Sequence, residues 1–338
     1  MSAPGFYERF VRPLLFALDP ETAHHLALGL LQAGSAFSPA LGLLRPFEPP
    51  PKPVRLFGLN FRNPIGLAAG FDKNGVALPA WAALGFGFVE IGTVTAKPQP
   101  GNPKPRIFRY PARQALINRL GFNNDGADIV ATRLRALRAS GRWPAIPIGI
   151  NIGKSKVTPL AEAAADYLYS FRQLREFADY LVLNVSSPNT PGLRALQEQE
   201  ALAHLLQSIR RENRESHKPI LLKIAPDLSE ADLDQIVRNC EQEEVAGLIA
   251  TNTTLDHSAI PAAADEAGGL SGAPLGARAT KFIRALKERT RLPVIGVGGI
   301  MTAGDAREKF DAGAALVQIY TGYIYRGPNF LLEIAAAL

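Results

Sequence analysis

The sequence predicts an α/β protein of the (β/α)8 barrel (TIM barrel) class with an N-terminal helical extension. Short apolar runs rich in β-branched residues recur along most of the chain, and each precedes a stretch of helical length. Eight alternating units of about 30 residues are typical of a closed barrel, whereas the alternative, a doubly wound open sheet, rarely needs so many. With 47% hydrophobic and 20% charged residues, the 338-residue chain can bury the large core of a barrel.

The first 45 residues are expected to form two short helices outside the barrel. Between Phe6 and Leu18 an apolar residue recurs at every fourth position, which predicts the first helix. Asp19 followed by Pro20 is typical of the N-cap and first turn of the second. The uncharged stretch 22–44 is divided by polar residues and turn signals into pieces too short to cross a bilayer. It is either a cap buried on the main domain or a surface that dips into the lipid interface.

A proline-rich segment separates this extension from the rest of the chain. Residues 46–53 hold five prolines in eight positions, which makes a stiff linker. We therefore expect a helical segment over 1–45, a linker over 46–53 and the barrel domain over 54–338. The strands are expected at 65–69, 88–92, 146–151, 181–185, 220–224, 248–251, 294–297 and 316–320. The helices are expected at 75–84, 127–139, 161–177, 197–211, 229–243, 279–290, 303–311 and 329–338.

The net charge of +6 comes from one segment. Residues 91–124 carry six basic side chains and no acid, whereas residues 1–53 are neutral. We read 91–124 as a basic loop that faces an anionic small molecule or a lipid headgroup surface. Nucleic acid is not an expected partner, because no helix-turn-helix, zinc-finger or aromatic RNA-binding signature accompanies the charge.

Disulfides and metal sites are not expected. Cys240 is the only cysteine, and the five histidines avoid every strand end. This cysteine usage favours a reducing compartment. The N-terminus lacks the basic-then-apolar order of a signal peptide, so secretion is not expected.

Polar residues follow the predicted strands, at the end of a barrel where active sites lie. Gly298 and Gly299 follow the seventh strand, where this fold usually holds a phosphate. Without a histidine base, a proton would be taken by Ser, Lys, Thr or a bound cofactor. Lys223 lies in an apolar run and would need a buried partner. Amides that suit a planar heterocycle with alternating C=O and N–H groups come from Asn118, Asn123, Asn151, Asn184, Asn189 and Asn252.

Nine segments, in order along the chain, resemble the dihydroorotate dehydrogenase family. The resemblance is to its class 2, quinone-dependent branch, because an N-terminal helical extension is present and a serine stands where class 1 enzymes carry a catalytic cysteine. The segments are GLAAGFDK (66–73), IGTVT (91–95), INRLGFNN (117–124), NVSSPNTPGLR (184–194), KIAPDL (223–228), ATNTT (250–254), GGLSG (268–272), GVGGI (296–300) and QIYTG (318–322).

The resemblance implies that dihydroorotate is oxidised to orotate on FMN in pyrimidine (UMP) biosynthesis, with the electrons passed to a membrane quinone. Ser187 would be the base that removes the C5 proton while hydride leaves C6 for flavin N5. Thr190 and an ordered water are our candidates for carrying that proton away. Substrate contacts are implied for Lys73, Asn118, Arg119, Leu120, Gly121, Phe122, Asn184, Asn189, Asn252 and Thr253. FMN contacts are implied for Ala69, Gly70, Phe71, Asp72, Lys73, Thr93, Asn151, Asn184, Lys223, Thr251, Gly272, Gly299, Tyr320 and Thr321.

The family's quinone tunnel runs between the N-terminal helices and the flavin edge. His24, Arg109 and Tyr320 match residues at its inner end, and His25 beside His24 leaves the choice of histidine open. The resemblance further implies a monomer. With no evident signal sequence, we expect a peripheral membrane protein of bacterial type on the cytoplasmic side of the cell membrane.

Two other functions remain open from the residues alone. The first is a phosphate-binding barrel lyase or isomerase that uses a Schiff base on Lys223. The second is a catalytically silent protein that binds a membrane surface, although the serine and both lysines argue against it. A flavin absorbance band separates the oxidoreductase from these two.

Overall fold

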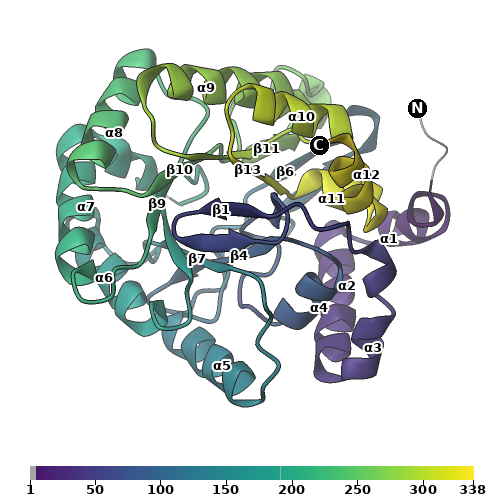
Figure 1. Cartoon of the computed structure of the whole chain (residues 1–338). Coiled ribbons are helices and arrows are strands. Elements are labelled where there is room, and N and C mark those ends of the chain that lie inside the picture. Colours follow the sequence, from purple (N-terminus) through teal and green to yellow (C-terminus); the bar gives the residue numbers. More distant parts are fainter. Residues whose placement is uncertain (1–4, 191) are drawn as a thin grey trace.

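Eight parallel strands close into a barrel with helices on its outside, which confirms the predicted class (Figure 1). The computed structural model describes residues 5–190 and 192–338. The strands are fully buried apolar runs, as parallel strands covered by helices must be. In barrel order they are β3 (Ile65–Leu67), β4 (Phe88–Thr95), β7 (Ile148–Gly153), β8 (Tyr180–Asn184), β9 (Ile220–Ile224), β10 (Gly247–Ala250), β12 (Val294–Val297) and β13 (Leu316–Ile319).

The eight predicted helices are present, with ends that shift by a few residues. Apolar side chains on one face of each helix pack against the barrel, and charged side chains face outward. A ninth, α11 (Thr321–Arg326), follows β13 and was not predicted. The others are α4 (Leu78–Ala83), α5 (Ala127–Ala139), α6 (Ala163–Leu174), α7 (Gln199–Asn213), α8 (Glu230–Gln242), α9 (Gly276–Arg289), α10 (Ala303–Asp311) and α12 (Asn329–Ala337).

A short hairpin closes the N-terminal end of the barrel. Strands β1 (Val54–Leu56) and β2 (Leu59–Phe61) are joined by a two-residue turn in which Phe57 and Gly58 both have positive φ. The Phe61 ring packs edge-on against Phe88 of β4, with the ring centres 5.3 Å apart. This plug seals one end, so the barrel opens only at the other.

The segment 91–124 is not the basic loop that the sequence suggested. Strands β5 (Ile107–Tyr110) and β6 (Ala115–Asn118) lie within it, and β6 pairs with β11 (Gly269–Gly272) to form a three-stranded antiparallel sheet. The pairing joins residues about 150 positions apart. It brings Asn118 and Gly272 to the open end of the barrel.

Three of the six basic side chains of this segment, Lys104, Arg106 and Arg119, form ion pairs within the molecule. Arg106 is buried and forms a two-pronged ion pair with Glu21 of the extension, at 2.7–3.2 Å. Arg119 pairs with Glu266 at 2.7 Å. Both acids lie far away in sequence, so a count of charge along the chain does not reveal these pairings.

The N-terminal extension packs beside α4, α11 and α12, at the right of Figure 1. The expected helix over Phe6 to Leu18 is divided into a π-helical turn, η1 (Tyr7–Val11), and α1 (Arg12–Ala17). The second begins as predicted, because the Asp19 side chain caps α2 (Pro20–Ala36) by accepting from two backbone N–H groups. Next come α3 (Ser38–Gly42) and a 3₁₀ turn, η2 (Arg45–Phe47), which overlaps the start of the expected linker.

The apolar stretch 22–44 is broken at Phe37, between α2 and α3. Among the described helices, none is by itself long and apolar enough to cross a membrane. Helix α2 and the helical segment after it reach the required length only together, with a bend of 115° between them.

Candidate active site

A single cavity at the open end of the barrel brings together most of the predicted site residues. It encloses about 990 Å³ of atom-free space, its open mouth included. Every strand of the barrel, or the loop that follows it, contributes to the site or to the layer beneath it. The predicted residues that line the cavity are Ala69, Gly70, Lys73, Thr93, Asn118, Leu120, Gly121, Phe122, Asn184, Ser187, Asn189, Lys223, Thr251, Asn252, Thr253, Gly272, Gly299, Tyr320 and Thr321.

Other predicted residues lie outside the lining. Asp72 is completely buried, and its carboxylate accepts hydrogen bonds from two backbone N–H groups and from Trp81 Nε1. Burial raises the pKa of Asp72, and those bonds oppose the rise. The side chain therefore shapes the loop after β3. Arg119 likewise turns toward Glu266, and its guanidinium stacks on the ring of Phe108, 4.6 Å from its centre.

Ser187 lies at the cavity wall in the segment after β8. Its side chain is almost buried, and its Oγ accepts a hydrogen bond from the backbone N–H of Asn189 at 3.2 Å. Thr190 is also buried, outside the lining, and its Oγ1 has no hydrogen-bond partner among the described residues. Among the described residues, the hydroxyl groups of Ser187 and Thr190 do not form a hydrogen bond with each other.

The asparagine side chains are connected to one another before any ligand binds. Asn184 Nδ2 donates to Thr93 Oγ1 at 2.9 Å, and Asn252 Nδ2 donates to Ser186 Oγ at 3.0 Å. Asn189 Nδ2 donates to the carbonyl and side-chain oxygens of Asn118 at 3.0 and 3.2 Å. These contacts fix the directions in which the amides face the cavity. Asn118, Asn184, Asn189 and Asn252 therefore lie together at the cavity wall.

Lys223 has the buried partner that its apolar surroundings demanded. Its Nζ lies 3.6 Å from Oε1 of Glu90, which is completely buried within β4. Asn151 Nδ2 donates to the same carboxylate at 2.8 Å, and Gln318 Nε2 donates at 2.5 Å. Strands β4, β7, β9 and β13 are thereby joined through one acid beneath the cavity. Asn151 belongs to this supporting layer and does not line the cavity.

Lys73 is the second cation of the cavity. Its burial, together with the positive charge of Arg106, lowers its pKa to about 8, although Glu21 and Asp72 oppose the shift. A lysine with this pKa is mostly charged at neutral pH and can hold an anionic group. An anion bound beside it would raise the pKa again.

Aromatic rings connect the cavity to the N-terminal extension. The ring of His24 lies 5.4 Å from that of Phe71, which in turn lies 5.2 Å from that of Tyr320 in the cavity wall. Burial, with the neighbouring Lys73 and His25 charges, lowers the pKa of His24 to about 3, so it is neutral at physiological pH. His25 is largely exposed. The geometry thus turns His24 inward and His25 outward.

Arg109 does not join this aromatic row. Its guanidinium donates to the backbone carbonyls of Leu15 and Leu18 and stacks over the ring of Phe16, 4.6 Å from its centre. It fastens the end of α1 to β5. Its contacts are those of a residue that holds the extension in place.

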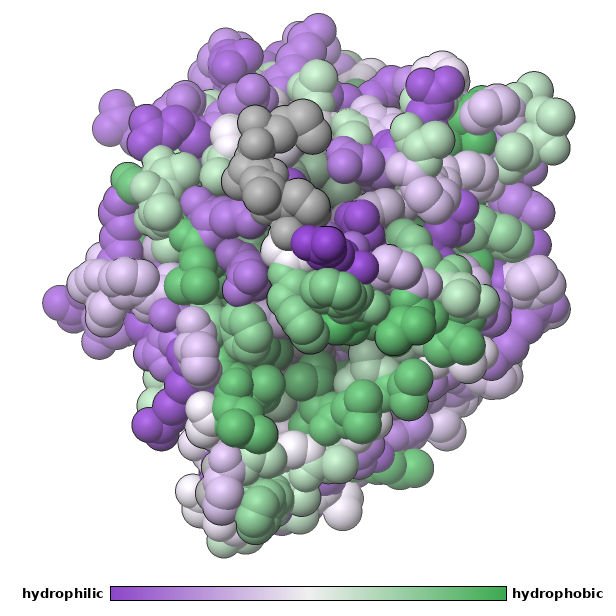
Figure 2. Space-filling view, turned by 90° about the vertical axis from the view of Figure 1, so that its right-hand side faces the viewer, coloured by the Kyte–Doolittle hydropathy of each residue, from purple (hydrophilic) through white to green (hydrophobic). Residues whose placement is uncertain are grey.

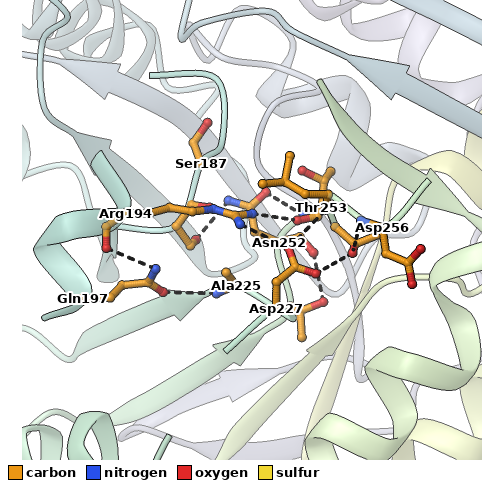
Figure 3. Close-up of polar contacts among 12 residues, drawn as sticks. Ser187, Arg194, Gln197, Ala225, Asp227, Asn252, Thr253 and Asp256 are labelled. Atoms are coloured by element: carbon orange, nitrogen blue, oxygen red, sulfur yellow. Dashed lines mark hydrogen bonds and ion pairs between the residues drawn. The ribbon is translucent and has the colours of Figure 1, made fainter. Parts of the chain in front are cut away.

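Sequence reasoning missed several residues that support the site. Glu90 gave a signal, since it is the only acid within a strand of apolar residues. Arg194 and Asp227 lay inside quoted segments but received no role. Figure 3 shows them beneath Ser187, where they contact the loops that carry Asn252 and Thr253.

Comparison with known proteins assigns the chain to a family. A profile described as dihydroorotate dehydrogenase matches residues 53–338. The protein named dihydroorotate dehydrogenase (quinone) of Gloeobacter violaceus is 54% identical over 334 residues, which cover 98% of this chain and 93% of the relative. The protein of the same name from Salinispora arenicola is 52% identical over 340 residues, which cover 98% of each chain.

Solved structures agree with this assignment. The crystal structure of dihydroorotate dehydrogenase from Eimeria tenella in complex with ferulenol superposes with a TM-score of 0.85 at 36% identity, covering 96% of this chain and 93% of that one. The ligand-free structure from the same organism gives 0.83 at 38% identity, with 94% of each chain covered. The chain belongs to the dihydroorotate dehydrogenase family, as its profile match, its full-length relatives and its barrel together require.

Proposed function

We propose that this protein oxidises dihydroorotate to orotate on a bound FMN, in pyrimidine biosynthesis, and passes the electrons to a membrane quinone. The observation that carries the proposal is one cavity in which Ser187 shares a wall with Lys73, Lys223 and the connected asparagines. The names of the full-length relatives, dihydroorotate dehydrogenase (quinone), support the same reaction.

The cavity fits FMN in its chemistry. Glycines line the end that follows β12 and β13, where backbone N–H groups can approach a phosphate. Thr253 Oγ1, also in the lining, is buried without a hydrogen-bond partner among the described residues, so the cavity retains polar capacity for a ligand. When bound, FMN would supply the hydride acceptor and the route for electrons to the quinone. The residues that would hold FMN are Ala69, Gly70, Lys73, Thr93, Asn184, Lys223, Thr251, Gly272, Gly299, Tyr320 and Thr321. Asn151 would support them from beneath.

Lys223 would act as a fixed positive charge. Because Glu90 and its amide donors hold the lysine side chain in place, its cation is positioned before negative charge develops on a ligand. The same ion pair disfavours the lyase alternative, because a Schiff-base lysine must react as a neutral amine.

Substrate orientation would come from Lys73 and the asparagines. Lys73 would attract the carboxylate of dihydroorotate, and the amides of Asn118, Asn184, Asn189 and Asn252 would hold the ring. Because these amides already bond to one another, little ordering remains to be done when the substrate arrives.

Ser187 would take the proton from C5 of the substrate. A serine hydroxyl is a weak base, so the proton must move on to a second acceptor in the same step. Thr190 lies three residues away, and its buried hydroxyl oxygen has no hydrogen-bond partner within 5–190 and 192–338. It is our candidate for that path, together with a water molecule.

The extension would deliver the quinone and contact the membrane. Figure 2 shows apolar side chains gathered on the face of the molecule that carries the extension. The row His24, Phe71, Tyr320 would connect this face with the cavity, and Arg109 would hold the adjoining helix. We propose a monomeric, peripheral attachment on the cytoplasmic side of the cell membrane.

The visible spectrum of the purified protein under anaerobic conditions tests the proposal. Adding dihydroorotate should bleach nearly all of the absorbance of a flavin band. A flavin band that dihydroorotate leaves unchanged would overturn the substrate assignment. If the protein contains no flavin and borohydride traps a covalent adduct on it, the oxidoreductase assignment is overturned and the lyase assignment is favoured.

A further inference from the structure

Two loops that line the cavity, after β8 and β10, meet the loop after β9 at one ion pair behind the cavity. Arg194, in the 3₁₀ turn η5 (Leu193–Gln197), donates from NH1 to Asp227 Oδ2 at 3.1 Å. Its Nε donates to the carbonyl of Ser186 at 3.1 Å, and its NH2 donates to the carbonyl of Thr253 at 3.3 Å. One guanidinium thus binds the residue before Ser187 on one side and a cavity-lining residue on the other (Figure 3).

We propose that Arg194 and Asp227 are a positioning pair that holds the Ser187 segment at a fixed distance from the Asn252–Thr253 segment. The proposal rests on the proposed function, in which Ser187 is the base and Asn252 and Thr253 contact the substrate. Neither Arg194 nor Asp227 lines the cavity, so both act through the loops that they join.

Asp227 extends the connection to a third loop and to the helix layer. Its carboxylate accepts from Thr254 Oγ1, from the backbone N–H of Leu255 at 3.1 Å and from Arg278 NH1 at 3.2 Å. With Arg194, four donors converge on two oxygens. The loops after β8, β9 and β10 are therefore fixed against one another by this carboxylate.

Gln197 adds a second contact between the same loops. Gln197 Oε1 accepts from the backbone N–H of Ala225 at 3.3 Å, at the end of β9 (Figure 3). Its Nε2 lies 3.5 Å from the carbonyl of Arg194. The turn that carries Arg194 is therefore anchored to the barrel as well as to the loops.

The planar fork of arginine makes this arrangement hard to replace. Its donors point in fixed directions, so the three acceptors must keep their mutual distances, whereas a lysine ammonium can satisfy the charge of Asp227 without spanning all three. A displacement of about 1 Å between a base and its substrate typically costs about 100-fold in rate. We therefore expect the chemical step to depend on Arg194 more than flavin binding does.

The test compares variants of the flavin-loaded, full-length protein. Arg194→Gln, Arg194→Lys and Asp227→Asn should each lower the limiting rate of flavin reduction by dihydroorotate about 10- to 100-fold in anaerobic stopped flow. Bound flavin per chain and the rate of reoxidation by a soluble quinone should stay within twofold of the parent. Arg278→Gln is the matched control. It removes another donor to Asp227, together with an ion pair to Asp256, but contacts neither Ser186 nor Thr253, so its reduction rate should fall much less than that of Arg194→Gln.

Three results would overturn the proposal. They are an unchanged reduction rate in Arg194→Gln, an equal loss in Arg278→Gln, and full recovery in Arg194→Lys, which would mean that charge alone suffices. If the parent protein's flavin is not reduced by dihydroorotate, the proposed function fails instead. Hydrogen exchange then still tests the positioning pair: Arg194→Gln should raise amide exchange at 186–190 and 252–255, Arg278→Gln should not raise it at 186–190, and unchanged exchange in Arg194→Gln would refute the proposal.

Discussion

The barrel and the N-terminal extension use apolar side chains in opposite ways. In the barrel, large apolar side chains are buried in the core, and polar contacts are kept for the cavity and its support. In the extension, the residues of α2 that are buried include Glu21 and Ser35, while Phe6, Leu14 and Leu30 are more than two-thirds exposed. The extension is thus fastened by polar contacts together with part-buried apolar side chains such as Leu28 and Leu31, and it presents other apolar side chains outward.

The polar contacts of the extension are specific. Ser35 Oγ accepts from the backbone N–H of Ala80, and Tyr7 OH donates to the carbonyl of Ile324 at 2.8 Å. Together with the ion pair between Glu21 and Arg106, they orient the segment and leave Phe6, Leu14 and Leu30 exposed. The comparison teaches that this segment is a docked surface layer whose outer face carries exposed apolar side chains.

The largest expected effect comes from a substitution in the barrel that leaves the extension intact. Ser187→Ala should lower the rate of flavin reduction by dihydroorotate about a thousandfold, since a positioned base typically contributes about 10²–10⁴. Stopped flow of the two half-reactions measures it. Reoxidation by quinone should proceed at the parental rate; a comparable loss there would show that the two regions are not separable.

The next variant removes the ion pair between the extension and the barrel. Glu21→Gln leaves Arg106 buried without its counter-charge, which should lower the free energy of unfolding by about 3–5 kcal/mol. Urea denaturation measures the change. The matched control is Glu266→Gln, at a half-exposed pair with Arg119, which should cost less than about 1 kcal/mol.

The same pair predicts a pH dependence. Burial favours a higher pKa for Glu21, but the hydrogen bonds and charge of Arg106 outweigh it and lower the pKa to about 2, from 4.5. The unfolded chain therefore takes up the proton first. The contribution to stability is complete above about pH 4.5 and is lost as the pH falls toward 2. Glu21→Gln should lack this acid-dependent loss.

A smaller effect concerns the outer face of the extension. Replacing Leu14, Leu30 and Leu43 together by serine should weaken binding to lipid vesicles about 100-fold, at about 1 kcal/mol for each partly inserted side chain. Vesicle co-sedimentation measures it. Leu255 and Val157 are exposed on the barrel, so serine at both should leave vesicle binding unchanged. Equal weakening would mean that the membrane-binding surface is not confined to the extension.

The smallest expected effect lies at the seam between the regions. His24→Ala should raise the KM for quinone about tenfold through loss of the ring contact with Phe71, about 1.4 kcal/mol. His25→Ala, on the exposed side, should leave that KM unchanged. The reverse result would show that quinone approaches along the outer histidine.

Much of this arrangement was predictable from sequence where the signal is local. The barrel strands are apolar runs bounded by polar residues, and the cap of α2 needs only Asp19 and Pro20. The strand-end asparagines were predictable for the same reason, because parallel strands deliver their ends to one edge. The family resemblance added the role expected of Ser187, which no local pattern could supply.

The missed features depend on distant partners. Strand β6 is only four residues long, and its pairing with β11 joins residues about 150 positions apart. The ion pair of Arg106 with Glu21 likewise crosses 85 positions. The sequence of neither partner indicates which residue it contacts, so the segment 91–124 resembled a loop. The β1–β2 hairpin was missed for a different reason: its two strands are only three residues long and come directly after the proline-rich stretch.

The acid beneath the cavity has a consequence for how the enzyme is assembled in the cell. Glu90 neutralises Lys223 from within the chain, and its other donors are side chains of the same barrel. A newly synthesised chain therefore does not have to recruit an anionic prosthetic group to offset a cation in its interior. The barrel can therefore mature before any ligand enters the cavity, because the charge of Lys223 is already offset from within the chain.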